Sequence, residues 1–495
     1  MAVSMRDASS EYLAYGRISF HTPGHKGRLE FFDGLRFPQG DLTELPELDC
    51  LAVPKGILAE AQSRAALAYG AEETFYLVNG ATAGNLALLL ALAGRVCEGE
   101  KGGCQVGGGC GVGDIRETVG SRDGCVYVSR TAHRSVLSAF VLSGLTPCYV
   151  LPVMHPDFAL PLGAEAEDFW RGEDKTLAVH VTCPVYYGSA LDMPGLLTLR
   201  DELGGRTPVL VDQAHGAHWR CGLFPPNAVE LGADGVVHSV HKTLAGLTQS
   251  ALLHAQGSRL DRRVLAQALA MVQSSSPSYL LMASLDAAVA QGEMAGVWRD
   301  LLAEAQRLRE DLADVYRVLG DKDVGSYGVA ALDGSKILVN TRPLGVSAGA
   351  VAGALRREFG IEPEFWDEEN ILFVLGVGNR PEDVGMLRRA LLKLADQSRG
   401  VGARLESSQA RSSTFGLSCS PPMRLTPREA WLAPRRLLAL GDCLGQVAAE
   451  TLVTYPPGVP LVIAGEEITE EVMCGVASNP LLRECSSLYV VDGIL

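Results

Sequence analysis

Short apolar runs alternate with amphipathic segments along most of the chain. Runs of strand length occur at 74–78, 125–129, 147–153, 177–182, 208–211 and 250–255. Helical spacing of apolar residues favours helices at 57–69, 85–93, about 195–203 and 259–271, with another beginning near residue 279. Strands that alternate with helices imply right-handed crossovers and a mostly parallel sheet. The pattern therefore predicts an α/β fold.

The pattern changes character after residue 293. A long helix is predicted at 294–319, followed by strands at 336–341 and 371–375 and helices at 347–359 and 382–395. A polar, Ser/Arg-rich stretch then precedes a last small unit. We divide the chain into an N-terminal arm (1–45), a large domain (46–293), a smaller α/β domain (294–395), a linker (396–420) and a small C-terminal α+β domain (421–495).

One segment of the large domain departs from the pattern. Residues 97–125 are rich in glycine and contain cysteines at 97, 104, 110 and 125. The gaps between these cysteines are irregular and no histidine lies among them, which argues against a metal site. We interpret the segment as an insertion that forms a mobile surface loop.

Composition narrows the functional classes. The 495 residues are 47% hydrophobic and 20% charged, which is ordinary for a soluble globular protein. A net charge of −15 argues against a nucleic-acid partner. No apolar run approaches the ~20 residues that span a bilayer, and the first residues have no signal-peptide core. The twelve cysteines contain no CxxC pair, so reduced thiols in the cytoplasm are expected and no metal centre is predicted.

Two charged residues follow buried strands at positions that suggest catalysis. Asp212 ends the strand at 208–211, and Lys242 comes shortly after the apolar run at 235–237. Ligands of α/β sheets bind outside the carboxyl ends of strands, so both side chains are expected at one crevice. A desolvated lysine can form a Schiff base with an aldehyde cofactor. An acid can keep the pyridine nitrogen of pyridoxal phosphate protonated. A surface lysine and a helix-capping aspartate are the alternative interpretations.

Several longer segments resemble one enzyme family. They are His21–Gly27, Val78–Asn85, Val211–His218, Ser239–Leu244, Ser276–Asp286 and Tyr455–Pro460. Together they resemble the signature segments of the bacterial-type ornithine/lysine/arginine decarboxylases, in order and over nearly the whole chain. The resemblance implies a pyridoxal-phosphate enzyme of fold type I, the aspartate aminotransferase fold. It also implies a short form that lacks the N-terminal receiver-like domain of longer members.

The resemblance assigns expected roles to individual residues. Lys242 would form the Schiff base, Asp212 would pair with the pyridine nitrogen, and His133 would stack on the ring. The turn at 79–84 opens a helix and so offers free N–H groups to a phosphate. The expected cofactor-binding set is completed by Ala81, Thr82, His215, Ser239, His241 and Ser276. Ser276 is expected to reach the phosphate of a neighbouring subunit, which makes a homodimer the smallest complete assembly.

The expected reaction is decarboxylation of arginine, lysine or ornithine to the corresponding amine, as in polyamine metabolism. Glu364 is a candidate for binding the distal cation of the substrate, although a solvated turn carboxylate is an alternative interpretation. We favour arginine or lysine, because short members of the family often use them. Two other functions stay open: an aminotransferase or other lyase of the same fold, and a catalytically idle cofactor-binding regulatory protein.

Overall fold

The computed structural model describes most of the chain. The described residues are 17–33, 41–94, 124–171, 176–291, 294–400, 419–453, 459–478, 482 and 486–493. Most of the predicted insertion (97–123), most of the predicted linker (401–418) and residues 454–458 lie outside them.

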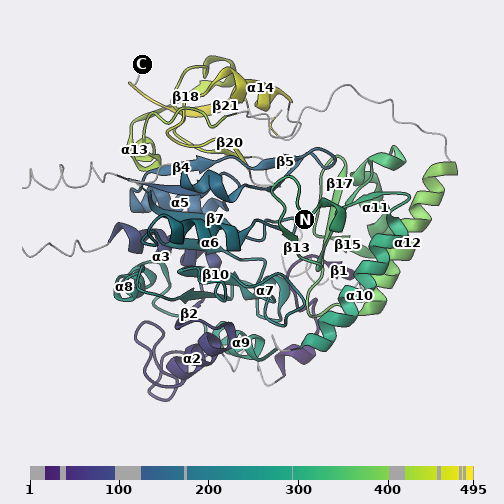
Figure 1. The fold of residues 1–495 in the computed structure, drawn as a ribbon, viewed down its shortest axis with the longest axis horizontal. Helices are drawn as coiled ribbons and strands as arrows, with labels where there is room; N and C mark the ends of the chain where they lie inside the picture. The colour runs from purple at the N-terminus through teal and green to yellow at the C-terminus, as the bar shows by residue number, and fades with distance from the viewer. Residues whose placement is uncertain are drawn as a thin grey trace, which may run out of the picture.

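The centre of the molecule is a seven-stranded sheet in the order β2-β11-β10-β9-β7-β3-β4 (Figure 1). Five neighbouring strands, from β10 to β4, run parallel, whereas β11 runs antiparallel to both β10 and β2. The predicted mostly parallel sheet is therefore confirmed. The strands are β2 (Glu73–Leu77), β3 (Cys125–Ser129), β4 (Pro147–Val150), β7 (Thr176–Thr182), β9 (Val209–Asp212), β10 (Gly235–Ser239) and β11 (Ala251–Ala255).

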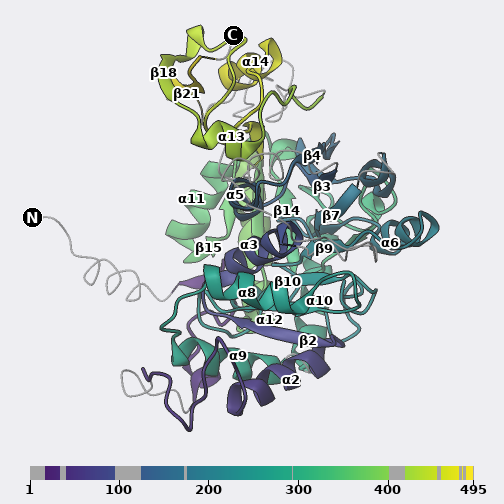
Figure 2. The same ribbon diagram turned by 90° about the vertical axis from the view of Figure 1, so that its left-hand side faces the viewer.

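Helices cover both faces of this sheet (Figure 2). On one face, α3 (Gly80–Ala93), α5 (Arg134–Ser143) and α8 (Arg262–Val272) share an apolar core with the strands. On the other face lie α6 (Met193–Glu202), α2 (Ile57–Tyr69) and α9 (Tyr279–Gln291). No helix within these described stretches is long and apolar enough to cross a membrane.

Local sequence explains where two of these helices begin and end. The helix predicted at 57–69 is α2 with the same bounds, and Gly70 ends it in the left-handed conformation (φ 71°). The helix predicted at 85–93 begins earlier, at Gly80. A Cβ on Gly84 would lie 2.9 Å from Leu77 Cδ1 and 3.0 Å from Val237 Cγ1. Small residues thus allow the first turns of α3 to pack closely on the sheet.

The second sheet is four-stranded and antiparallel, in the order β12-β14-β17-β16. Its strands are β12 (Arg317–Val318), β14 (Lys336–Asn340), β16 (Phe365–Trp366) and β17 (Asn370–Val374). Helices α10 (Ala295–Leu312), α11 (Ala348–Glu358) and α12 (Pro381–Gly400) accompany it. The predicted end of the first helix at residue 319 is wrong, because residues 317–318 leave the helix to pair with β14.

The N-terminal arm joins the two sheets beside Lys242. Strand β1 (Ile18–Phe20) pairs in parallel with β15 (Ile361–Pro363). In the turn that follows, Gly24 N donates to His241 O (2.7 Å), and Gly378 N donates to Gly24 O (3.0 Å). A Cβ on Gly24 would lie 2.5 Å from the carbonyl carbon of Thr243, so only glycine fits here.

The C-terminal residues form a separate layer at the top of Figure 1, next to α5 and β4. The layer comprises α13 (Pro427–Leu432), β18 (Arg435–Ala439), β19 (Leu452–Val453), β20 (Pro460–Val462), α14 (Glu470–Ser478) and β21 (Ser487–Val491). A buried ion pair joins it to the central sheet: Arg130 Nη1 lies 2.6 Å from Glu466 Oε1, and both side chains are at most 1% exposed.

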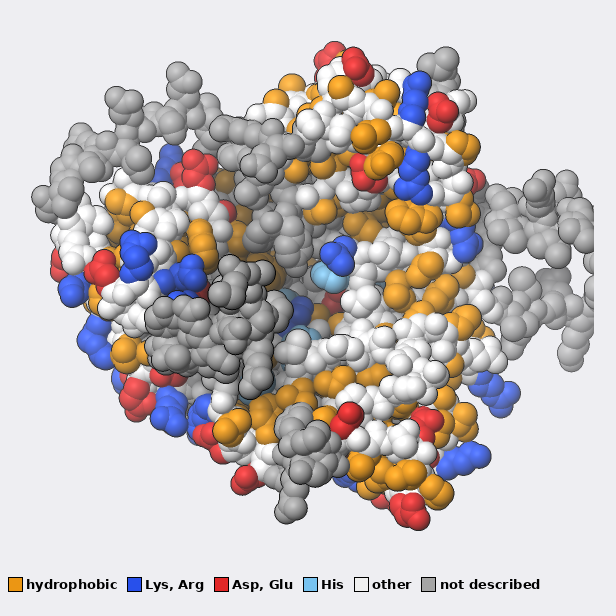
Figure 3. Space-filling view, turned by 180° about the vertical axis from the view of Figure 1, so that it is seen from behind, with side chains coloured by type: hydrophobic (Ala, Val, Ile, Leu, Met, Phe, Trp, Pro, Cys, Tyr) orange, Lys and Arg blue, Asp and Glu red, His pale blue; other side chains and the backbone are white. Residues whose placement is uncertain are grey.

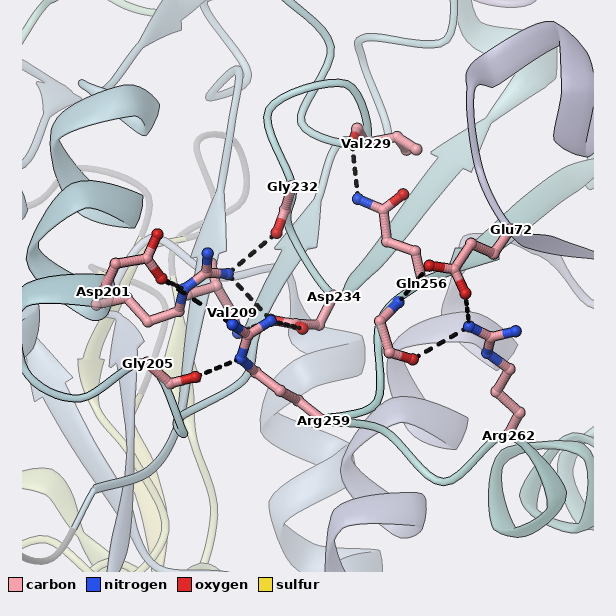
Figure 4. A network of polar contacts seen from close by, with 12 residues as sticks. Glu72, Asp201, Gly205, Val209, Val229, Gly232, Asp234, Gln256, Arg259 and Arg262 are labelled. Carbon is pink, nitrogen blue, oxygen red and sulfur yellow. Dashed lines mark hydrogen bonds and ion pairs between the residues drawn. The ribbon is translucent and has the colours of Figure 1, made fainter.

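A second buried network holds the amino ends of two central strands (Figure 4). Asp234 precedes β10 and accepts a hydrogen bond from Val209 N (2.8 Å), at the start of β9. Arg259 Nη1 lies 3.0 Å from the other carboxylate oxygen of Asp234. This network lies at the end of the strands opposite Asp212 and Lys242, so it supports the sheet.

Candidate active site

A cavity of about 870 Å³ opens at the carboxyl ends of the central strands. Figure 3 shows histidine, basic and acidic side chains gathered in a hollow near the middle of one face. Every predicted site residue except Ser276 lines the cavity: Ala81, Thr82, His133, Asp212, His215, Ser239, His241, Lys242 and Glu364. Parallel strands bring these residues together, although they are far apart in the sequence.

Lys242 lies in a short helix, α7 (Val240–Thr243), directly after β10. Its Nζ is 3.0 Å from His215 Nε2. Burial lowers the pKa of Lys242, and the carboxylates of Asp212 and Glu364 oppose this shift. A lysine with a lowered pKa holds more neutral amine, which is the nucleophilic form.

Asp212 ends β9 and is only 2% exposed. Its Oδ2 accepts a hydrogen bond from Asn85 Nδ2 (2.8 Å), and its Oδ1 accepts one from Ala214 N (3.1 Å). Within the described part of the chain, no cationic side chain forms an ion pair with this carboxylate. A buried carboxylate without a cation is costly, so the site fits a ligand that brings a positive charge to this oxygen pair.

A chain of hydrogen bonds determines the tautomer of His133. Asn85 Nδ2 donates to both Asp212 and Ser135 Oγ (3.0 Å), which leaves the Ser135 hydroxyl free to donate to His133 Nδ1 (2.8 Å). Ser135 N also donates to that nitrogen (3.2 Å). Burial lowers the pKa of His133, so the ring is neutral and carries its proton on Nε2. Its orientation at the start of α5 is thereby set.

The start of α3 can hold an anion. Asn79 precedes the helix but makes no side-chain cap; its Oδ1 accepts instead from Ser274 N (3.2 Å). The first N–H groups of α3, at Gly80 to Thr82, therefore face the cavity without a capping side chain. Ser239 and His241 line the same cavity, and His241 Nδ1 donates to Ser250 O (3.1 Å).

Glu364 reaches the cavity from the second sheet. Its Oε2 accepts a hydrogen bond from Thr22 N (2.8 Å), and its Oε1 accepts one from Tyr186 OH (3.0 Å). The carboxylate is thus held in the cavity wall by a residue of the N-terminal arm and a residue of the loop after β7. This placement disagrees with the alternative of a freely solvated turn carboxylate.

Ser276 lies outside the cavity of its own chain. It is exposed, and its backbone oxygen accepts a hydrogen bond from Ser274 Oγ (3.3 Å). The predicted contact with the phosphate of a neighbouring subunit therefore stays a prediction.

Sequence reasoning missed several residues of the site. Asn85 and Tyr186 hold Asp212 and Glu364, and Lys336 touches His215. The C-terminal layer supplies a further wall that includes Trp431 and Glu450. No local signal marks these residues, because their positions follow from pairings between distant segments. Asn85 lies in a segment that carries the family resemblance, and the resemblance also implies that the loop containing Tyr186 borders the cofactor.

Comparison with known proteins agrees with this geometry. The sequence model of the Orn/Lys/Arg decarboxylase major domain matches residues 5–97 and 114–323. The model of the C-terminal domain of the same family matches residues 414–476. The chain belongs to the Orn/Lys/Arg decarboxylase family. The stretch between the two parts of the first match lies within the predicted insertion.

Several relatives of this decarboxylase are named for basic amino acids. It is 31% identical to an arginine decarboxylase of Bacillus subtilis, with 93% of this chain and 90% of the relative covered. It is 30% identical to an arginine decarboxylase of Halalkalibacterium halodurans, with the same coverage. A lysine decarboxylase of Pseudomonas aeruginosa is 25% identical, with 93% of this chain and 73% of the relative covered.

Solved structures agree on the fold. Lysine decarboxylase A from Pseudomonas aeruginosa superposes with a TM-score of 0.73 at 20% identity, and the match covers 98% of this chain and 80% of that one. The constitutive lysine decarboxylase of Escherichia coli gives 0.71 at 18% identity, with 98% and 81% covered. The protein has the fold type I architecture predicted from its sequence, and it is an amino-acid decarboxylase that acts on a basic amino acid.

Proposed function

We propose that this decarboxylase uses pyridoxal phosphate, bound between Lys242 and Asp212, to convert arginine to its amine. The observation that carries the proposal is that a half-buried lysine and a buried carboxylate, which forms no ion pair with the described residues, open into one cavity. The N–H groups at the start of α3 fit the phosphate, and the Asp212 carboxylate fits a protonated ring nitrogen.

Each residue of the cavity has a defined task in this reaction. Lys242 would hold the cofactor covalently through its amine. Asp212 keeps a proton on the ring nitrogen by charge attraction, and His133 lies against the ring. When bound, the cofactor would supply the electron sink for the bonding pair that stays on Cα as carbon dioxide leaves, until a proton returns to Cα. Lys242 then helps the amine product leave.

Glu364 is proposed to bind the distal cation of the substrate. It is already held by Thr22 N and Tyr186 OH, so it can form a charge-assisted hydrogen bond without reorganising. Among the three basic amino acids we propose arginine, because the relatives that match at 29–31% identity and over about nine tenths of this chain include four named arginine decarboxylase.

The catalytic assignment is tested with Lys242→Ala. We expect this variant to lose turnover and to lose covalent attachment of the cofactor, trapped with borohydride and located by peptide mass spectrometry. A Glu364→Gln variant should keep the attachment but bind substrate more weakly. Robust decarboxylation by Lys242→Ala would contradict the assignment.

The substrate is tested by offering arginine, lysine and ornithine separately and measuring the amine product and carbon dioxide. We expect arginine to give the highest kcat/KM. A higher value for lysine or ornithine would correct the substrate, whereas formation of a 2-oxo acid without carbon dioxide would indicate an aminotransferase.

A further inference from the structure

A buried lysine, Lys336, lies behind the proposed active site. Lys336 is the first residue of β14, is 3% exposed and does not line the cavity. Its Nζ is 2.9 Å from His215 Nδ1, while the other ring nitrogen of His215 is 3.0 Å from Lys242 Nζ. The three side chains therefore form one continuous unit, Lys336–His215–Lys242, which couples the second sheet to the central one.

The backbone holds Lys336 in this place. Gly188, with φ 96°, lies so close that a Cβ on it would be 2.5 Å from both Cβ and Cγ of Lys336. Asp333 N donates to Gly188 O (2.8 Å), and Lys336 N donates to Asp333 O (3.0 Å). The loop after β7 and the start of β14 thus enclose the lysine stem, and its amine can reach His215.

Counting protons shows that the two lysines cannot both be charged. A neutral imidazole has one N–H and one bare nitrogen, and an ammonium group can only donate. The N–H of His215 must therefore donate to the lone pair of a neutral amine, while the bare nitrogen accepts from the other lysine. If the ring were protonated, both lysines would have to be neutral. At least one of the two lysines is therefore a neutral amine, whether the His215 ring is neutral or protonated.

With the cofactor bound at Asp212, as proposed above, the surroundings favour the proton on Lys336. Asp333 raises the pKa of Lys336, and this carboxylate is fully buried and ionised, with its own pKa lowered to about 2. Asp212 attracts a proton to Lys242. In the proposed function a protonated cofactor ring would pair with Asp212 and remove this attraction, so this step rests on the proposed function. Burial lowers the pKa of Lys336 to about 8 and also lowers that of Lys242 and, strongly, that of His215. Other ionisable groups that act on the unit are Glu364, His133, His241 and Lys26, a further lysine that interacts with Lys336.

We propose that Lys336, acting through His215, is a positioning residue that keeps Lys242 in its neutral, nucleophilic form. Lys336 donates to Nδ1 and thereby places the ring proton on Nε2, where it donates to Lys242. Lys336 does not touch the substrate. Its effect is on the pH at which Lys242 loses its proton and becomes nucleophilic.

The test measures Lys242 directly in the full chain saturated with pyridoxine 5′-phosphate, which has the ring and phosphate of the cofactor but no aldehyde that could react with Lys242. Formaldehyde with cyanoborohydride methylates only neutral amines, so peptide mass spectrometry of Lys242 across a pH series gives the midpoint at which it loses its proton. In Lys336→Met we expect this midpoint to rise by about one unit, because a like charge and the donating tautomer are both lost. Labelling below the midpoint should fall about tenfold.

Two comparisons separate the proposed route from other effects. Lys322→Met, on an exposed lysine, should leave the midpoint unchanged. In a His215→Phe background, Lys336→Met should shift the methylation midpoint of Lys242 little further. A shift equal to the one seen with His215 present would mean that the two lysines repel each other directly, and it would overturn the role of His215. If Lys336→Met does not fold, as judged by circular dichroism, Lys336→Gln should give a smaller rise in the same direction.

The outcomes also distinguish the two proposals. An unchanged midpoint in a folded Lys336 variant overturns the inference, whatever the enzyme does. A wild-type protein in which added pyridoxal phosphate never attaches to Lys242 overturns the proposed function, while the methylation experiment still reads the coupling of the two lysines.

Discussion

His180 shows how one buried residue can make the fold sensitive to acid. It lies in β7, is fully buried, and neither ring nitrogen has a hydrogen-bond partner among the residues described. Burial lowers its pKa from 6.5 to about 4, and the nearby Asp212 only partly opposes this. The folded protein therefore holds this ring neutral at a pH where the unfolded chain binds a proton.

The difference in proton binding between the folded and unfolded states gives the sign of the pH effect on stability. Above pH 6.5 the ring is neutral in both states, so it adds no pH dependence. As the pH falls from 6.5 to about 4, only the unfolded state takes up the proton, and the free energy of unfolding falls by up to about 3 kcal/mol. We expect His180→Leu to reduce this dependence of the free energy of unfolding on pH.

The measurement is denaturant unfolding of His180→Leu and wild type at a series of pH values. At neutral pH the variant should be at least as stable, because two unpaired nitrogens leave the core. His241 and His254, whose pKa values burial also lowers, should leave a residual slope in both proteins. Parallel curves for the two proteins would contradict the assignment to His180.

At the scale of elements, the contact between the C-terminal layer and the central sheet includes one buried ion pair. Arg130 follows β3, three residues before His133, and both of its terminal nitrogens bond to Glu466 (2.6 and 2.8 Å). Glu466 also accepts from Ile463 N (2.8 Å). The same side chains thus attach the layer and support the loop that carries His133.

Removing one member of this pair leaves the other charge buried and unmatched. We expect Glu466→Ala to lower the free energy of unfolding by about 3–5 kcal/mol, measured by denaturant titration. The neighbouring Glu467 offers a matched control, because its pair with Arg424 is partly exposed and Glu467→Ala should cost less than about 1 kcal/mol. Similar losses for both variants would refute a special role for the buried pair.

These elements also show what the sequence can and cannot predict. The bounds of α2 and β3 follow from local apolar spacing and glycine punctuation, and both match. Asp212 and Lys242 could be placed at one crevice because strand ends meet at one edge of a parallel sheet. The end of α10 was wrong because pairing of β12 with β14 overrode helical spacing. Lys336 could not be found, because its approach to His215 depends on contacts between two separate sheets.

At the scale of the whole molecule, the cavity is assembled from parts that are distant in sequence. The central sheet supplies Asp212 and Lys242, the second sheet supplies Glu364, and the C-terminal layer supplies Trp431. The proposed contribution of Ser276 would come from a neighbouring subunit, because in its own chain this residue is exposed and outside the cavity.

A hybrid experiment tests the proposed shared site. Lys242→Ala removes the reactive amine of a site, while Ser276→Glu would place a carboxylate against the phosphate of the partner's site, so each homodimer should be inactive. When the two variants are unfolded, mixed in equal amounts and refolded together, half of the dimers are hybrids. Each hybrid has one site with both defects and one with neither, so about a quarter of wild-type activity should return.

The control is the same mixing with Lys242→Ala and Asp212→Ala, two residues of one cavity. Hybrids of that pair have one defect in each site, so activity should not return. Ser276→Glu homodimers that are fully active would show that Ser276 touches no phosphate. Recovery with neither pair would place Ser276 in the site of its own chain and would remove the argument for a shared active site.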